Sequence, residues 1–154
     1  LNKVTHINRS NVYVENLFAS IERLMKPSLA SKHIALNFDL SNSQLQVKID
    51  SYLIEQVLIN LIVNARDALQ GKEGAEVLIT AKSTTDGYTL IKVIDNGNGI
   101  PPEIQETIFV PFFTTKKNGS GIGLSLSKQI MMLHKGKIQI HSEEHKGTAI
   151  SLLF

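Results

Sequence analysis

Three polar side chains recur at helical spacing in the otherwise apolar segment between Glu55 and Gln70. Asn60, Asn64 and Asp67 stand at positions i, i+4 and i+7, so a helix would align them along one edge of its apolar face. Asparagine is only a modest helix former, so two of them at this edge need an explanation. Their oxygens could bind a magnesium ion that keeps several waters and contacts phosphate. The alternative is two half-exposed amides that hydrogen-bond to neighbouring loops.

A second segment with chemical potential directly follows a predicted strand and reads Asp95-Asn-Gly97-Asn-Gly99-Ile100. Its alternate glycines allow backbone conformations that other residues resist, and they let a flat ligand approach the main chain closely. Asp95 can accept a hydrogen bond from an exocyclic amine such as that of adenine. A tight turn with a capping Asp is the alternative, because Asp-Asn-Gly is common in turns. A calcium loop fits less well, because the oxygen-bearing side chains are too few.

Two further segments carry groups that bind phosphate. In the segment 109–118, Thr114, Thr115 and Lys116 supply hydroxyl and ammonium donors. Its phenylalanines could anchor the base of a loop, and a surface loop pinned by aromatic residues is the alternative. The segment 119–124, Gly-Ser-Gly-Ile-Gly-Leu, opens a predicted helix, where exposed backbone N–H groups favour an anion. The segment is not a dinucleotide fingerprint, because Leu124 stands where the third glycine is required, and no Walker-A sequence occurs.

Composition excludes several other functions. The 154 residues, 42% of them hydrophobic, suit one domain with a single core and exclude disorder. A net charge of +2 with scattered basic residues gives no reason to expect a nucleic-acid partner. The absence of cysteine excludes disulfides, thiolate zinc sites and a cysteine nucleophile. No apolar run approaches the roughly 18 residues of a membrane span, so we expect no direct membrane contact. Because the chain begins at Leu1 without a leader, we expect a cytoplasmic piece of a longer protein.

The elements that must position these groups follow from hydrophobic periodicity. After a linker over residues 1–10, we predict a first helix that begins at Asn11 and is ended or kinked at Pro27. A second helix runs from Glu55 to Gln70, with Asp50 or Ser51 as the N-cap, and a third from Gly121 to Leu133. Alternation predicts strands over Ile34–Leu40, Leu45–Ile49, Glu76–Ser83, Tyr88–Asp95, Lys137–His141 and Thr148–Phe154.

Taken in order, the four segments resemble the ATP-binding domain of sensor histidine kinases, within the wider group that includes gyrase, mismatch-repair and heat-shock chaperone ATPases. Residues 60–68 resemble the N box, 95–100 the G1 box, 109–115 the F box and 119–124 the G2 box. Gly147-Thr148 resembles the last glycine element. The similarity covers residues 11–154, and five elements in the family's order are far more specific than one. The resemblance therefore implies a catalytic domain over residues 11–154.

The resemblance implies an α+β fold: a two-layer α/β sandwich in which helices cover one face of a mixed sheet, with ATP in a cleft beneath a lid. Asp95 would bind the adenine amine, helped by Thr148 through a water. Asn64 would coordinate Mg²⁺, with Asn60 near the phosphates. By the same resemblance, the triphosphate and the rest of the nucleotide would contact Asp67, Gly97, Gly99, Ile100, Phe109, Thr114, Thr115, Lys116, Gly119, Ser120, Gly121, Ile122, Gly123 and Leu124.

The N box also separates branches of the group. Gyrase-like and chaperone-like ATPases carry a Glu near Asn60 that activates water, whereas this chain resembles the histidine kinases in having Asn. That leaves no evident general base, which fits transfer to a histidine that is already nucleophilic when neutral. Asn60, Asn64 and Lys116 are the implied catalytic residues. Many histidine kinases have a basic residue where Asp67 stands, so Arg66 and Lys116 are the candidates for neutralising the phosphates.

The resemblance also implies partners. None of the five histidines is followed by Glu and Pro as in the family's phospho-acceptor pattern, so we expect each to be a surface or packing residue. The acceptor histidine would lie on a dimerisation domain outside this chain, and a response regulator would act downstream. Two other hypotheses remain: an ATP-hydrolysing or serine-kinase member of the same group, and a nucleotide-binding regulatory module.

Overall fold

The structure, a computed structural model, describes residues 6–105, 107–110 and 122–154, with only the helical placement of 122 and 123. The helices in these residues are α1 (Val14–Ala30), α2 (Ser51–Ala68), α3 (Pro102–Gln105) and α4 (Ile122–Leu133). The strands are β1 (Ser10–Tyr13), β2 (Ala35–Leu40), β3 (Gln46–Ile49), β4 (Glu76–Ser83), β5 (Thr89–Asp95), β6 (Lys137–Glu143) and β7 (Gly147–Leu153).

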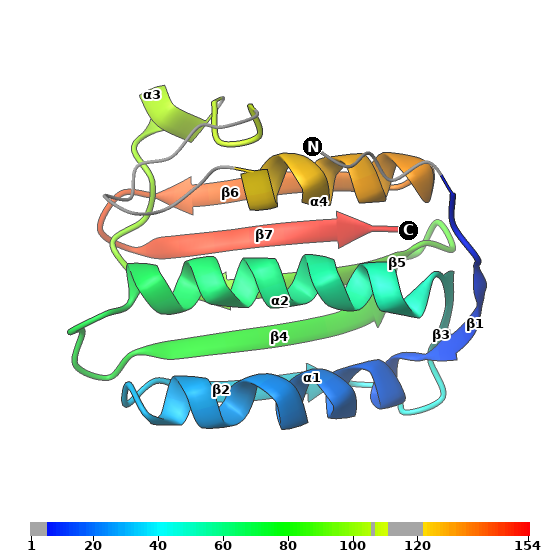
Figure 1. Cartoon of the computed structure of the whole chain (residues 1–154), viewed down its shortest axis with the longest axis horizontal. Helices are drawn as coiled ribbons and strands as arrows, with labels where there is room; N and C mark the ends of the chain where they lie inside the picture. The colour runs from blue at the N-terminus through cyan, green and yellow to red at the C-terminus, as the bar shows by residue number, and fades with distance from the viewer. Residues whose placement is uncertain (1–5, 106, 111–121) are drawn as a thin grey trace.

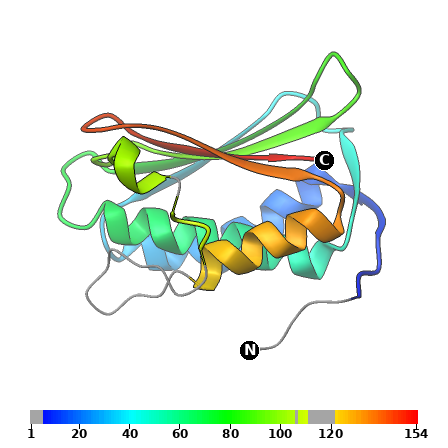
Figure 2. The same cartoon turned by 90° about the horizontal axis from the view of Figure 1, so that it is seen from above.

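The elements form two layers. Five strands make a mixed sheet in the order β2-β4-β5-β7-β6, and β1 pairs with β3 in a separate two-stranded sheet. Helices α1, α2 and α4 lie side by side on one face of the large sheet, with α2 in the middle (Figures 1 and 2). Strand β2 runs parallel to β4, while the other neighbours are antiparallel. This is the α+β sandwich that the sequence implies.

The register of β5 and β7 matters most for the site. Asp95, the last residue of β5, is the Cα partner of Thr148, the second residue of β7. Because cross-strand partners project to the same face of a sheet, their side chains lie next to each other on the helix side. In turn Thr148 is the Cα partner of Ser142 on β6. Three strands thus bring three polar side chains into one row.

The N-terminal part differs from the sequence prediction. Residues Ser10–Tyr13 form β1, paired antiparallel with β3, and α1 begins at Val14 instead of Asn11. Of the two outcomes predicted at Pro27, an end of the helix is wrong, because α1 continues to Ala30, and a kink stays a prediction. Pro27 is exposed, so water can satisfy the backbone carbonyl that a proline leaves without a helical donor.

Apolar faces of the three long helices meet the alternating apolar side chains of the sheet to form the core. Asp50 caps α2 by accepting a hydrogen bond from Leu53 N at 3.2 Å, as predicted. In the part of the chain that the structure describes, every helix is too short or too polar to cross a membrane. The buried residues of α2, which lies at the centre of this layer, are Ile54, Val57, Leu58, Leu61, Ile62 and Ala65.

Candidate active site

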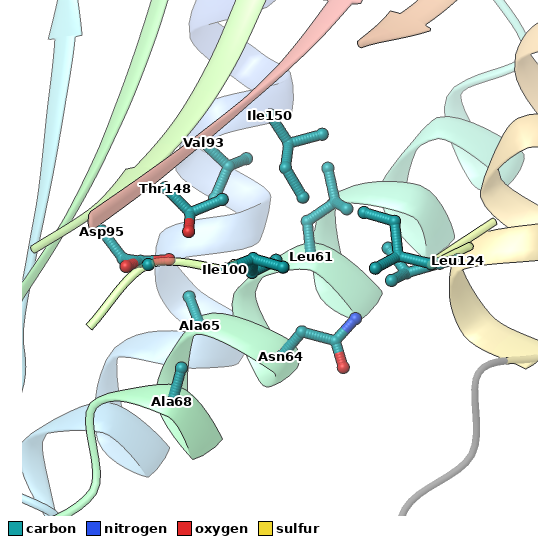
Figure 3. A pocket seen from close by; sticks show the side chains of 12 residues that line it. Leu61, Asn64, Ala65, Ala68, Val93, Asp95, Ile100, Leu124, Thr148 and Ile150 are labelled. Atoms are coloured by element: carbon teal, nitrogen blue, oxygen red, sulfur yellow. The ribbon is translucent and has the colours of Figure 1, made fainter. Parts of the chain in front are cut away.

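A cavity of about 90 Å³ lies between the helix layer and the sheet. Three polar residues border it: Asn64 on α2, Asp95 at the end of β5, and Thr148 on β7. Figure 3 shows Asp95 and Thr148 together at one end, and Asn64 pointing from α2 farther along. The other residues that line the cavity are small or apolar: Leu61, Ala65, Ala68, Val93, Gly99, Ile100, Ile108, Leu124 and Ile150.

Asp95 is a partly buried carboxylate at the polar end of this cavity. Burial raises its pKa above the ordinary value, while hydrogen bonds from the backbone N–H groups of Gly97 and Thr148 lower it. The Gly97 N–H donates to Asp95 Oδ1 at 2.9 Å. Two donors occupy only part of a carboxylate's capacity of about four acceptor positions. The side chain can therefore accept further hydrogen bonds from a donor that enters the cavity.

Thr148 is buried next to Asp95 and belongs to a polar network. Its Oγ1 lies 2.9 Å from Ser142 Oγ on β6. The Ser142 hydroxyl also accepts from Ile100 N at 2.7 Å, and the Gln105 amide donates to the carbonyl oxygens of Ile100 and Ser142. The network connects the loop after β5 to the β6–β7 hairpin, so both walls of the cavity's polar end are held together.

Close packing requires glycines in the loop after β5 and at the start of β7. A Cβ at Gly99, whose φ is +74°, would overlap the backbone carbonyl of Glu143. A Cβ at Gly147, whose φ is +127°, would overlap the carbonyl oxygen of Asp95. A Cβ at Gly97 would lie 3.0 Å from Asp95 Oδ1 and crowd it. Backbone thus approaches backbone where a side chain would not fit.

The predicted polar stripe on α2 is only partly brought to the cavity. Asn64 borders the cavity. The described lining includes neither Asn60, one turn earlier on α2, nor Asp67, near the end of the helix. Asn60 is half-buried and Asp67 is exposed. The roles predicted for these two residues near the phosphates remain predictions.

Arg66 points away from the cavity. Its Nη1 donates to Ser28 Oγ of α1 at 2.6 Å, on the side of α2 opposite to Asn64. Its Nε is buried without a hydrogen-bond partner among the described residues and lies 3.6 Å from Asp67 Oδ1. A side chain fixed between α1 and α2 cannot also reach a ligand in the cavity, so Arg66 is a poor candidate for neutralising phosphates.

Several predicted site residues lie at or beyond the edge of the described structure. Phe109 packs under the ammonium of Lys128 on α4, 5.9 Å from the ring centroid. Leu124 and Ile100 line the cavity. Among the described residues, no group of three or more His, Asp and Glu side chains could hold a metal ion. Outside the described residues lie Thr114, Thr115, Lys116, Gly119, Ser120 and Gly121, and nothing is described of the side chains of Ile122 and Gly123.

Of the small and apolar lining residues, only Gly99, Ile100 and Leu124 were predicted, and the hydroxyl network was not. Ala65 and Ala68 adjoin the predicted polar stripe at helical spacing, and their small side chains leave the space that the cavity occupies. Val93 and Ile150 each stand two residues from a predicted site residue on the same strand. Those periodicities could have found the lining, whereas nothing local marks Ser142 or Gln105.

The geometry can be compared with known proteins. The model of a family described as histidine kinase-, DNA gyrase B- and HSP90-like ATPases matches residues 49–154. The chain belongs to this ATPase family. The matched range includes Asn64, Asp95 and Thr148, so the cavity lies within the part of the chain that the family model matches.

Relatives of this chain include sensor histidine kinases. ZraS of Salmonella typhimurium strain LT2 is 32% identical over 150 residues, covering 97% of this chain and 32% of ZraS. AtoS of Escherichia coli K12 is 36% identical over 115 residues, covering 75% of this chain and 19% of AtoS. The chain thus spans about a third or less of the length of the curated relatives it matches.

A solved structure of similar extent gives the same result. The nucleotide-free catalytic domain of the histidine kinase ThkA is 31% identical, with a TM-score of 0.86. The match covers 96% of this chain and 95% of that domain. Within the ATPase family, the chain is therefore a histidine kinase-type catalytic domain.

Proposed function

We propose that this domain binds Mg-ATP and transfers the γ-phosphoryl group to a histidine on a dimerisation domain. The observation that carries the proposal is the partly desolvated Asp95 carboxylate beside Thr148, at the end of an otherwise apolar cavity. An apolar slot with one acceptor end suits a flat purine whose amine donates to that end. A hydrogen bond to a charged group contributes about 1.5–3 kcal/mol, enough to select such a base.

The residues present also fit a magnesium ion. Mg²⁺ in phosphate-binding sites is held by one or two protein oxygens, waters and the phosphates themselves. Asn64 offers an amide oxygen from a helix that borders the cavity. In the described part of the chain, no cluster of three or more His, Asp and Glu side chains offers another metal site. We assign Asn64 as the protein ligand. The ion would neutralise charge on the phosphates when bound.

The remaining catalytic residues act by positioning and charge. Phosphoryl transfer needs little covalent chemistry from the protein, so amides, hydroxyls, an ammonium and backbone donors are sufficient. We assign Asn60 to the phosphates and Lys116 to charge neutralisation, because Arg66 is committed to Ser28. Thr114, Thr115 and the start of α4 would hold the triphosphate.

The partners follow from the relatives. ThkA in complex with the response regulator TrrA is 29% identical to this chain, with a TM-score of 0.80, and the match covers 41% of that chain. This supports a response regulator as the downstream partner. Residues 11–154 would be the catalytic domain and residues 1–10 a linker to the dimerisation domain. The domain would work in the cytoplasm, where ATP is supplied.

The test is phosphotransfer in trans. The domain is incubated with γ-labelled ATP, Mg²⁺ and a separately produced dimerisation domain of a related histidine kinase. We expect an acid-labile, base-stable phosphohistidine on the acceptor, lost in Asn64→Ala. The matched control is Gln56→Ala, two turns earlier on α2 and outside the cavity lining. A folded, ATP-bound domain that never labels an acceptor would contradict the proposal. Steady phosphate release without an acceptor would favour a hydrolytic ATPase instead.

A further inference from the structure

Three hydrogen bonds converge on the hydroxyl of Ser142, a residue of β6 that does not itself line the cavity. Ile100 N donates to Ser142 Oγ at 2.7 Å, from the loop after β5. Ser142 Oγ donates to the carbonyl oxygen of Gly147 at 3.0 Å. Thr148 Oγ1 lies 2.9 Å away, and geometry alone allows either hydroxyl to donate in that pair.

Counting protons decides the direction of the last bond. A serine hydroxyl has one proton to donate and two lone pairs to accept with. If its proton goes to the Gly147 carbonyl, both lone pairs are left for Ile100 N–H and the Thr148 hydroxyl. Only this arrangement satisfies all three contacts at once. In it, Thr148 donates its single proton to Ser142.

The direction of the hydrogen bond between Thr148 and Ser142 determines what the Thr148 hydroxyl presents to the cavity. Thr148 is 9% exposed and borders the cavity next to Asp95. With its proton directed to Ser142, its oxygen presents only lone pairs to a ligand. Asp95, when ionised, also presents only lone pairs. The polar end of the cavity is thus an acceptor surface made of two side chains from neighbouring strands.

We propose that Ser142 is a positioning residue that sets this hydrogen-bond polarity and thereby favours bases that present a donor at the six-position. Adenine offers an amine at its six-position, whereas hypoxanthine and guanine offer a carbonyl oxygen there. A carbonyl at that position would directly face the lone pairs of Asp95 and Thr148, acceptor against acceptor. The proposal rests on the proposed nucleotide-binding function and names a determinant of its base specificity.

The surrounding packing keeps Ser142 in place before any ligand arrives. Gln105 Nε2 donates to the Ser142 carbonyl at 3.1 Å and to the Ile100 carbonyl at 2.7 Å. His145 N donates to the Asn98 carbonyl, and Gly99 abuts the Glu143 backbone. Loop and hairpin are therefore joined at several points. A site whose hydrogen-bond directions are fixed in advance discriminates without rearrangement.

The test compares ATP with inosine triphosphate, whose base carries a carbonyl oxygen in place of the six-amine and a proton on the adjacent N1. Dissociation constants for both are measured on the wild-type domain and on Ser142→Ala, Ser142→Cys and Ser142→Thr. Ser151→Ala, on β7 but on the opposite face of the sheet, is the matched control. Thermal melting of each variant reports folding.

We expect the wild-type preference for ATP to fall about tenfold in Ser142→Ala, because Thr148 can then turn its proton into the cavity. Cysteine keeps the volume but bonds weakly, so Ser142→Cys should behave like alanine even if alanine loosens the fold. Ser142→Thr should restore the preference, and Ser151→Ala should leave it unchanged.

Two failures are distinguishable. A folded wild-type domain that binds neither nucleotide would overturn the proposed function itself. Wild-type binding with an unchanged preference in Ser142→Ala and Ser142→Cys would overturn the role of Ser142 alone. The same holds if both variants weaken ATP and inosine triphosphate equally, because a merely structural residue would act that way.

Discussion

The partly buried Asp95 and the buried His134 lie at opposite ends of the helix layer and differ in how completely their hydrogen-bonding capacity is used. Strand β5 ends with Asp95 and helix α4 ends directly before His134. The two elements end on opposite sides of the molecule (Figure 1). His134 is 6% exposed, and its Nε2 accepts a hydrogen bond from Asp50 N at 3.0 Å. Its Nδ1 lies 2.8 Å from the carbonyl oxygen of Ile130, and its ring meets Phe154 edge-on.

This difference in hydrogen-bond pairing distinguishes a polar group that stabilises the fold from one that can bind a ligand. With the proton on Nδ1, both ring nitrogens of His134 are paired with backbone, so nothing remains for a ligand. Asp95 keeps acceptor capacity, and a cavity lies in front of it. A fully paired buried group stabilises the fold. One that keeps free capacity is costly in the empty protein, and a ligand can offset that cost.

The largest expected effect is on stability at the cavity end. Gly99→Ala should lower the free energy of unfolding by about 3 kcal/mol, because the new methyl group overlaps the Glu143 carbonyl. Gly87→Ala is the matched control: its φ is +87°, but no atom lies within 4 Å of the added Cβ, so about 1 kcal/mol is expected. Urea unfolding measures both. Equal losses would show that the loop and hairpin are not tightly packed.

The second-largest expected effect is a loss of stability at the end of the helix layer where His134 lies. His134→Ala should cost about 2–3 kcal/mol of stability, because it leaves the Asp50 N–H unpaired and opens space beside Phe154. ATP affinity of the folded protein should stay within about twofold of wild type. Exposed His141 offers a control, since His141→Ala should change neither. A large loss of ATP affinity in folded His134→Ala would show that the His134 end of the helix layer also contributes to binding.

A smaller effect, a gain in stability, is expected from substitution of Asp95. Asp95→Asn should stabilise the ligand-free domain by about 0.5–1 kcal/mol at neutral pH, because an ionised carboxylate is no longer buried. The pKa of Asp95 is raised in the folded state, so the folded state holds the proton more tightly than the unfolded chain. Wild-type stability therefore falls as pH rises from about 4 through that raised pKa.

The variant lacks this loss, so its advantage over wild type should grow with pH across the same window. Chemical unfolding of both proteins between pH 4 and 8 measures it. A variant that is less stable than wild type at every pH would show that Asp95 is as fully satisfied as His134.

The smallest effect concerns Arg66. Because its guanidinium bonds Ser28, Arg66→Met should change ATP affinity by less than about twofold. The methionine keeps an apolar stem between α1 and α2, so folding should persist. Nucleotide titration measures the affinity. A tenfold or larger loss would mean that Arg66 neutralises the phosphates after all.

Local sequence patterns predicted most of the fold. The alternation of Val77, Ile79 and Ala81 predicted β4 to the residue, and the apolar arc and N-cap predicted α2. Strand β1 was missed because it has only four residues and forms by pairing with β3, a long-range contact that no local pattern reveals. The four-residue helix α3 is likewise too short to leave a periodic signal. The sheet order depends on such long-range pairing, so it was not predicted; the resemblance implied only a mixed sheet with helices on one face.

The site was predicted to a similar extent and for similar reasons. Asp95, Asn64 and Thr148 carry recognisable types at recognisable spacings, and the structure brings all three to one cavity. Ser142 and Gln105 were not found, because their contacts arise from the pairing of Ser142 with Thr148 and from loop packing. Tertiary neighbours, and not sequence spacing, define that part of the site.

Calorimetric titration with ATP and ADP, with and without Mg²⁺, tests the central claim most directly. The proteins are the wild-type domain, Asp95→Asn and, as the matched control, Asp86→Asn in the exposed β4–β5 turn. We predict saturable binding to wild type and Asp86→Asn, and binding about 10- to 100-fold weaker to a folded Asp95→Asn. Equal affinities for all three, or no binding by a folded wild-type domain, would contradict Asp95 as the group that selects the base.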